Sequence, residues 1–181
     1  NIWTNLKQAL PHIEHMDLYG GEPLMIENMW DILTHSVENG YSKNQTIHYN
    51  TNGSIMPSDE QIELWKQFKL VDVQVSVDDI NDRHHYQRYP SEWDKVRDNV
   101  LKFKNHSWIR LSTNGTISNY NIFYLDEITD EIVKNIGTSV WYNILHAPYD
   151  QSVAALDPEI KEILVKKLEH LNSYQHEIMP I

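Results

Sequence analysis

The stretch Val71-Asp72-Val73-Gln74-Val75-Ser76-Val77-Asp78 decides the fold class, because its apolar and polar residues alternate strictly. The four valines lie on one face of a strand, and the four polar side chains lie on the other. Central strands of an open sheet with helices on both faces are apolar throughout. One polar face therefore favours a barrel with helices outside and a ligand inside. An antiparallel sheet with one wet face is the alternative, which the long helical crossovers disfavour.

Further β-type runs alternate with helical patterns, in the order typical of α/β folds. We predict strands over residues 13–19, 46–51, 71–78, 109–113 and 140–145. Helices are predicted over 27–39 and 125–136, after the capping box Ser58–Gln61, after Ser91, and from Asp157-Pro158. The prediction is a partial TIM-type (β/α)6 barrel, incomplete with about five βα units, in a single domain over residues 1–181.

Charge and composition exclude several classes of protein. The 181 residues include 26 acidic and 15 basic ones, for a net charge of −11, and the acidic excess is shared by both halves. A broad nucleic-acid face is therefore not expected. No apolar run approaches the roughly 18 residues of a membrane span, and no signal peptide is recognisable. We expect no membrane partner and a cytoplasmic location.

The sequence contains no cysteine. This excludes disulfides, a thiolate zinc site, a cysteine nucleophile and an iron–sulfur cluster held by thiolates of this chain. The ten histidines show neither H-x-H nor H-E-x-x-H spacing. We therefore assign no metal ligand.

Two short strings carry the strongest local signals. Gly20-Gly21-Glu22-Pro23 follows the first predicted strand, and its glycines allow close backbone approach to a ligand, with a carboxylate beside them. Two glycines before a proline are most often simply a turn. Thr51-Asn52-Gly53-Ser54 recurs as Thr113-Asn114-Gly115-Thr116, each just after a predicted strand. The echo indicates either repeated βα units or the ordinary preference of Asn-Gly for tight turns.

Three strings taken in order resemble the motifs of the radical S-adenosylmethionine (SAM) superfamily. Gly20–Pro23 looks like its GGEP motif, and Tyr49-Asn50-Thr51-Asn52-Gly53 is similar to its T-N-G motif. The segment from Val75 to Tyr89 resembles the S-x-D-G…H-D-x-x-R pattern of the branch with SPASM or twitch auxiliary domains. Asp79 stands where glycine is usual, and His85 stands where aspartate is usual. The resemblance covers roughly residues 10–150.

The resemblance implies that SAM lies across the open end of the barrel and chelates one iron of a [4Fe–4S] cluster. Gly20 and Gly21 would offer backbone contacts to the methionyl amino group, with Glu22 and Pro23 fixing the loop. Thr51-Asn52 would lie near the sulfonium side of the cofactor.

The remaining implied contacts come from later strands. Ser76 and Asp78 would face the ribose or the carboxylate of SAM. Arg88 would pair with the SAM carboxylate or the substrate, Arg110 with the same carboxylate, and Asn114 is a weaker candidate. The alternatives are a strand end capped by Ser76 and Asp78, a surface arginine at 88, and pairing of Arg110 with a local acid.

The superfamily holds its cluster with three cysteines after the first barrel strand, and here they are missing. We expect that strand and its cysteine loop to lie outside this chain; a chain that has lost the loop is the alternative. The parent would form a 5′-deoxyadenosyl radical with a reductant protein and a small-molecule or peptide substrate, whereas this chain alone is predicted to be inactive. An exposed barrel edge would be covered by homodimerisation or by the N-terminal segment.

Two other classes of function stay open. One is a clusterless barrel that binds SAM or another small ligand without radical chemistry. The other is an ordinary barrel hydrolase or lyase that uses Glu22, Asp78 and Arg88 as acid, base and clamp.

Overall fold

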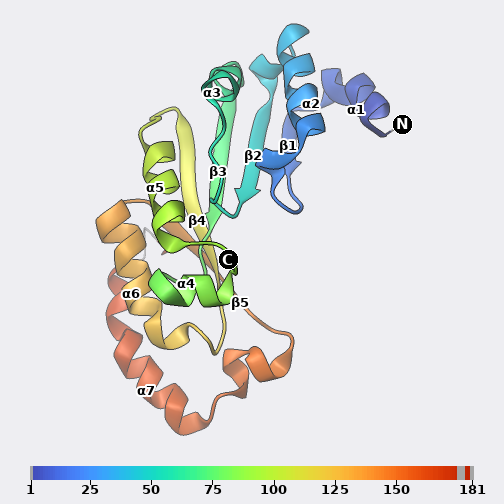
Figure 1. The fold of residues 1–181 in the computed structure, drawn as a ribbon. Coiled ribbons are helices and arrows are strands. Elements are labelled where there is room, and N and C mark those ends of the chain that lie inside the picture. Colours follow the sequence, from blue (N-terminus) through green and yellow to red (C-terminus); the bar gives the residue numbers. More distant parts are fainter. Residues whose placement is uncertain (1, 175–177, 180–181) are drawn as a thin grey trace. The chain divides into compact units, whose positions relative to one another are not determined.

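Strands and helices alternate along the chain (Figure 1), in a computed structural model that describes residues 2–174 and 178–179. The chain divides into two units. The first comprises Asn1–Val75 and Asp98–Leu111, and the second comprises Ser76–Arg97 and Ser112–Ile181. Helix α5 (Trp93–Lys104) contributes residues to both units.

The first unit is built on three parallel strands in the order β1 (His15–Leu18), β2 (Thr46–Thr51) and β3 (Leu70–Ser76). In their register Thr51 lies opposite Val75, at the carboxyl ends of β2 and β3. The other regular segments of this unit are α1 (Ile2–Ala9), α2 (Glu27–Glu38), α3 (Asp59–Trp65) and the 3-10 turns Leu10–His12, Pro23–Met25 and Ser42–Asn44.

An aromatic cluster fills the core of the first unit. Tyr49 of β2 and Trp65 of α3 are buried with ring centroids 4.9 Å apart, and Trp30 and Phe103 stack on Trp65 at 5.8 and 6.3 Å. The Trp65 indole N–H donates to the Tyr49 hydroxyl at 3.2 Å. Aromatic pairs of this kind each add about 0.5–1.5 kcal/mol beyond area burial. The cluster packs β2 against helices of the same unit, on the face of the sheet that carries Tyr49.

In β3 the valines lie on a buried face and the polar residues lie on the other face, as the alternating sequence predicts. Val71, Val73 and Val75 are 0–1% exposed, on the face that packs in the core. On the opposite face, Asp72 lies beside His48 of β2, and Gln74 lies beside Asn50 of β2. This face of the sheet is therefore polar. The predicted capping box is also present, because Ser58 and Gln61 exchange side-chain-to-backbone hydrogen bonds at the start of α3.

Strand β4 (Ile109–Ile117) begins in the first unit and enters the second at Ser112. There it is followed by the parallel strands β5 (Ser139–Ile144) and β6 (Ile178–Met179), in the order β4-β5-β6. The other segments of the second unit are α4 (Asn81–Gln87), α6 (Leu125–Asp130), a π-helical turn (Glu131–Ile136), α7 (Pro158–Leu168) and the 3-10 turns Ile122–Tyr124, Tyr149–Gln151, Val153–Ala155 and Glu169–Tyr174. The predicted stripe over 125–136 is therefore an α-helix that widens into a π turn, and it ends at Gly137 with φ 73°.

The second Asn-Gly string corrects one prediction. β4 runs through Thr113-Asn114-Gly115-Thr116 to Ile117 instead of ending at Thr113. A Cβ on Gly115 would lie 2.5 Å from the Val77 carbonyl oxygen, so glycine permits close approach of backbone here. Gly53, in contrast, has φ 73° and follows β2 in a turn. The two strings are similar in sequence and serve different local structures.

Candidate functional site

The Gly20–Pro23 loop follows β1 in the first unit. Gly20 and Gly21 have φ of 100° and 31°, and apart from the glycine and its chain neighbours no atom of the described residues lies within 4 Å of the position where a Cβ would be at either one. A side chain would be strained by the backbone there, although space is open. Pro23 is buried and begins the short 3-10 turn to Met25. The loop therefore presents bare main chain to open space.

The Glu22 carboxylate ties this loop to the end of β2. Oε1 accepts from the Thr51 hydroxyl at 2.8 Å and from the Leu24 N–H at 3.2 Å, and Oε2 accepts from the Asn52 N–H at 2.9 Å. Thr51 and Asn52 then brace the next turn, because their side chains accept from the Gly53 and Ser54 N–H groups. The first two sequence motifs thus form one hydrogen-bonded group within the first unit.

Asp78, from the third motif, is the centre of the corresponding group in the second unit. One carboxylate oxygen accepts from the Thr116 N–H at 2.7 Å, and the other lies 2.8 Å from Arg88 Nε. Asn121 donates to the backbone carbonyls of both Asp78 and Thr116 at 2.8 Å. Arg88 is accordingly an ion-pair partner of Asp78 rather than an isolated surface side chain. Asn114 accepts from the Val77 N–H through its backbone carbonyl.

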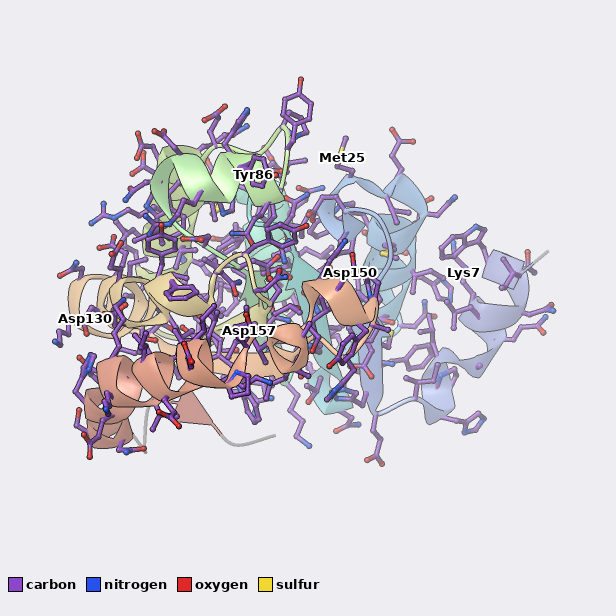
Figure 2. All side chains as sticks on the ribbon, turned by 90° about the horizontal axis from the view of Figure 1, so that it is seen from below. Lys7, Met25, Tyr86, Asp130, Asp150 and Asp157 are labelled. Atoms are coloured by element: carbon purple, nitrogen blue, oxygen red, sulfur yellow. The ribbon has the colours of Figure 1, made fainter. Side chains whose placement is uncertain are left out.

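A pocket of about 490 Å³ opens beside Asp78. Its lining lies entirely in the second unit and consists of Asp78, Tyr86, Gln87, Thr116, Ser118, Tyr120, Leu145 and Gln151. Tyr86, labelled on α4 in Figure 2, and Tyr120 are both exposed, with ring centroids 6.5 Å apart. Carboxylate, amide and hydroxyl groups beside aromatic and apolar surface suit a small organic ligand.

Most of these lining residues were not predicted. Thr116 belongs to the second Asn-Gly string, and that string was the one available signal for it. Tyr120 comes from a loop and Gln151 from the three-residue 3-10 turn Tyr149–Gln151, and in neither does a periodic pattern mark a residue as facing a pocket. A second pocket, of about 570 Å³, is mainly apolar and lies along α7; it contains no predicted site residue.

The two departures from the family pattern lie in the loop after β3 and in α4. Asp79 is fully buried; Oδ1 accepts from the Ile80 N–H and from Arg83, and Oδ2 accepts from Gln87. Burial raises the pKa of Asp79, and these three hydrogen bonds oppose the rise. His85 lies 2.8 Å from Glu92. Asp79 therefore anchors both ends of α4.

Arg110 makes a local ion pair in the first unit. Its Nη2 atom lies 2.5 Å from Asp72 Oδ2, and it is the second residue of β4, at the amino end of that strand. Burial alone would raise the pKa of Asp72, but hydrogen bonds from His48 and Arg110 and their charges lower it. Ser76 is the last residue of β3.

Within residues 2–174 and 178–179 no group of three or more histidine, aspartate or glutamate side chains is arranged to hold a metal ion. No helix in this part of the chain is both long and apolar enough to cross a membrane.

Comparison with known families decides the superfamily, since the sequence model described as "Radical SAM superfamily" matches residues 3–139. The chain belongs to the radical SAM superfamily. A search of curated proteins gave no significant match. The similar solved structures establish the fold, a partial radical SAM barrel of the α/β class.

Two of these solved structures illustrate the likeness. Native anSMEcpe with bound AdoMet has a TM-score of 0.68 at 14% identity, over 98% of this chain and 53% of that one. SuiB from Streptococcus suis has a TM-score of 0.63 at 14% identity, over 98% of this chain and 41% of that one. The radical SAM chain described here thus spans about half the length of these proteins, or less.

Proposed function

We propose that this radical SAM chain is the SAM-binding part of an enzyme of the SPASM or twitch branch. The observation that carries the proposal is the pocket beside Asp78, in a chain of this superfamily. Its volume of about 490 Å³ lies within the roughly 300–1,000 Å³ of small-molecule sites. When bound, SAM would supply radical chemistry once an electron from a cluster held outside this chain cleaves its sulfonium.

The pocket residues suit an adenosine group. Asp78 and Ser118 offer an acceptor and a hydroxyl for ribose hydroxyl groups, and Leu145 offers apolar surface for adenine. Arg88 and Thr116 act on Asp78, because they hold both of its carboxylate oxygens. In this proposal Arg88 positions the carboxylate that binds ribose.

The first unit is assigned a separate contact. Gly20 and Gly21 present main chain to open space, which suits a polar group of a ligand. Glu22 has its oxygens engaged by three donors, so it acts as a brace of the loop. This engagement also argues against Glu22 as the acid of a hydrolase. Arg110 is left out of the cofactor set because Asp72 already binds it.

The residues of this chain do not fit a [4Fe–4S] cluster. Such clusters need thiolate ligands, and the sequence contains no cysteine. We propose that cluster ligands come from outside this chain, and that the chain alone does not cleave SAM. A reductant protein, a small-molecule or peptide substrate, a homodimer and a cytoplasmic location stay predictions.

Calorimetry with SAM and S-adenosylhomocysteine tests the proposal. We expect both to bind the chain, Asp78→Asn to weaken binding about tenfold through loss of a charged acceptor, and Gly21→Val to weaken it through the strained loop. Glu63→Gln, at a side chain 66% exposed, is the matched control and leaves binding unchanged. Absence of SAM binding to the folded chain would refute the proposal. SAM cleavage after anaerobic reconstitution with iron and sulfide would refute the expected inactivity.

A further inference from the structure

A second polar group lies in the first unit, on the polar face of the sheet. His48 of β2 and Asp72 of β3 are directly opposite in the strand register, with His48 Nδ1 3.0 Å from Asp72 Oδ2. Arg110 approaches the same oxygen at 2.5 Å. None of these residues belongs to the Gly20–Pro23, Thr51-Asn52 or Asp78 groups.

The two nitrogens of His48 have different surroundings. Nδ1 faces the carboxylate, whereas Nε2 has no hydrogen-bond or ion-pair partner within the residues that the structure describes. The His48 side chain is 15% exposed, and the edge of the Tyr19 ring is its aromatic neighbour at 6.0 Å. A carboxylate on Nδ1 selects the tautomer with Nδ1–H and leaves a lone pair on Nε2.

The carboxylate is itself held in place. The Asp72 side chain is 12% exposed, and the Arg110 guanidinium, whose own side chain is 60% exposed, bonds to it. The lowered pKa of Asp72 keeps it ionised and able to accept from His48. Asp17, opposite His48 on β1, is bound by His15 at 2.9 Å. The strand neighbour on the other side therefore has its own partner.

The contacts among His48, Asp72 and Arg110 are those expected of a general base that is held in one orientation. A general base needs an accessible lone pair, an imidazole fixed in one tautomer, and an orienting group behind it. His48, Asp72 and Arg110 supply the base, the orienting carboxylate and the cation that fixes this carboxylate. An ion pair with a purely structural role needs only Arg110 and Asp72, and it gives no reason for an imidazole with one open nitrogen.

We propose that His48 Nε2 is a proton acceptor for a substrate bound on this face, with Asp72 and Arg110 as positioning residues. The substrate class is a molecule that presents a weakly acidic N–H, O–H or S–H group. The proton passes to Nε2, the electron pair stays on the substrate atom, and the imidazolium is stabilised by Asp72. The proton then returns to product or solvent. The proposal does not depend on SAM binding.

The experiment measures the tautomer and the reactivity of His48 in the full chain. Long-range ¹H–¹⁵N correlation spectra, assigned with His48→Gln, are expected to show Nδ1 protonated and Nε2 unprotonated. Diethylpyrocarbonate, which acylates unprotonated imidazole nitrogen, then serves as the probe, with mass spectrometry following each histidine. We expect Asp72→Asn to slow modification of His48 about tenfold, the effect of losing one hydrogen bond to a charged group. Arg110→Gln is expected to act in the same direction with a smaller effect.

Asp17→Asn is the matched control, because it removes a carboxylate from a histidine on the same sheet. It is expected to change His15 and leave His48 unaltered. A His48 with Nε2 protonated in the unsubstituted chain would overturn the proposal, and this measurement requires no variant to fold. Equal His48 rates in the unsubstituted chain and in folded Asp72→Asn would overturn it as well.

Discussion

Glu22 offers the sharpest test of how the sequence motifs hold together. Its carboxylate accepts three hydrogen bonds, from Leu24, Thr51 and Asn52, and the last two partners lie 29 and 30 residues further along the chain. Glu22→Ala removes all three bonds at once. Glu22→Gln keeps the shape but places an amide NH₂ where one oxygen accepts from a backbone N–H.

The expected loss of stability follows from the three hydrogen-bond donors that Glu22→Ala leaves without an acceptor. A hydrogen bond to a charged group contributes about 1.5–3 kcal/mol, and an unsatisfied buried donor costs about 1–3 kcal/mol. Thr51 is 1% exposed, so its hydroxyl cannot turn freely to water, whereas Glu22 is only half-buried and water replaces part of the loss. We expect Glu22→Ala to lower the free energy of unfolding by about 3 kcal/mol and Glu22→Gln by about 1.5 kcal/mol.

Urea unfolding at neutral pH, followed by tryptophan fluorescence, measures both changes, because Trp30 and Trp65 report on the core of the same unit. Glu63→Gln is the control, since its exposed ion pair with Lys66 contributes at most about 1 kcal/mol. If Glu22→Ala unfolds within about 0.5 kcal/mol of the unsubstituted chain, the carboxylate does not hold the loop to β2. The role of Glu22 in holding the loop would then be wrong, even if the chain binds SAM.

Three further predictions concern stability. Tyr49→Phe leaves the buried Trp65 N–H without its acceptor and is expected to cost about 1–2 kcal/mol in urea unfolding; an unchanged midpoint would show that water or another group replaces it. Gly115→Ala places a Cβ 2.5 Å from the Val77 carbonyl oxygen and is expected to cost about 1–3 kcal/mol, seen as a lower Tm; an unchanged Tm would show that the strands shift freely. Because the pKa of Asp72 is lowered by folding, its stabilisation is present above the unfolded pKa and lost as pH falls through the folded one. The unfolding free energy of Asp72→Asn is therefore expected to fall less between about pH 6 and pH 3 than that of the unsubstituted chain, and parallel pH profiles would contradict this.

The fold was largely predictable because its signals are local. Alternation of valine with polar residues predicted β3 and its polar face, and a capping box predicted the start of α3. The predicted end of β4 was wrong by four residues, since the strand was expected to stop at Thr113, before Asn114-Gly115. What keeps Gly115 in a strand is the carbonyl of Val77, a neighbour in space that no local pattern reveals.

The candidate site was less predictable, because its contacts are not local. The motifs marked Glu22 and Asp78, but their partners Asn52 and Thr116 lie 30 and 38 residues away. Pairing of Arg110 with a local acid was one of two alternatives, and only the structure identifies that acid as Asp72. Gln151 lines the pocket from a short 3-10 turn that is far from Asp78 in the sequence.

The aspartate at position 79 shows how a departure from a family pattern can replace one means of shaping a loop with another. Glycine leaves a backbone free to turn, whereas the buried Asp79 carboxylate fixes the segment by binding Ile80 at the start of α4 and Gln87 at its end. Gln87 also lines the pocket beside Asp78, and Arg88 directly follows it and pairs with Asp78. The carboxylate therefore sets the position of α4, and through α4 the position of two side chains at the proposed SAM site. Asp79 contributes to that site without lining the pocket.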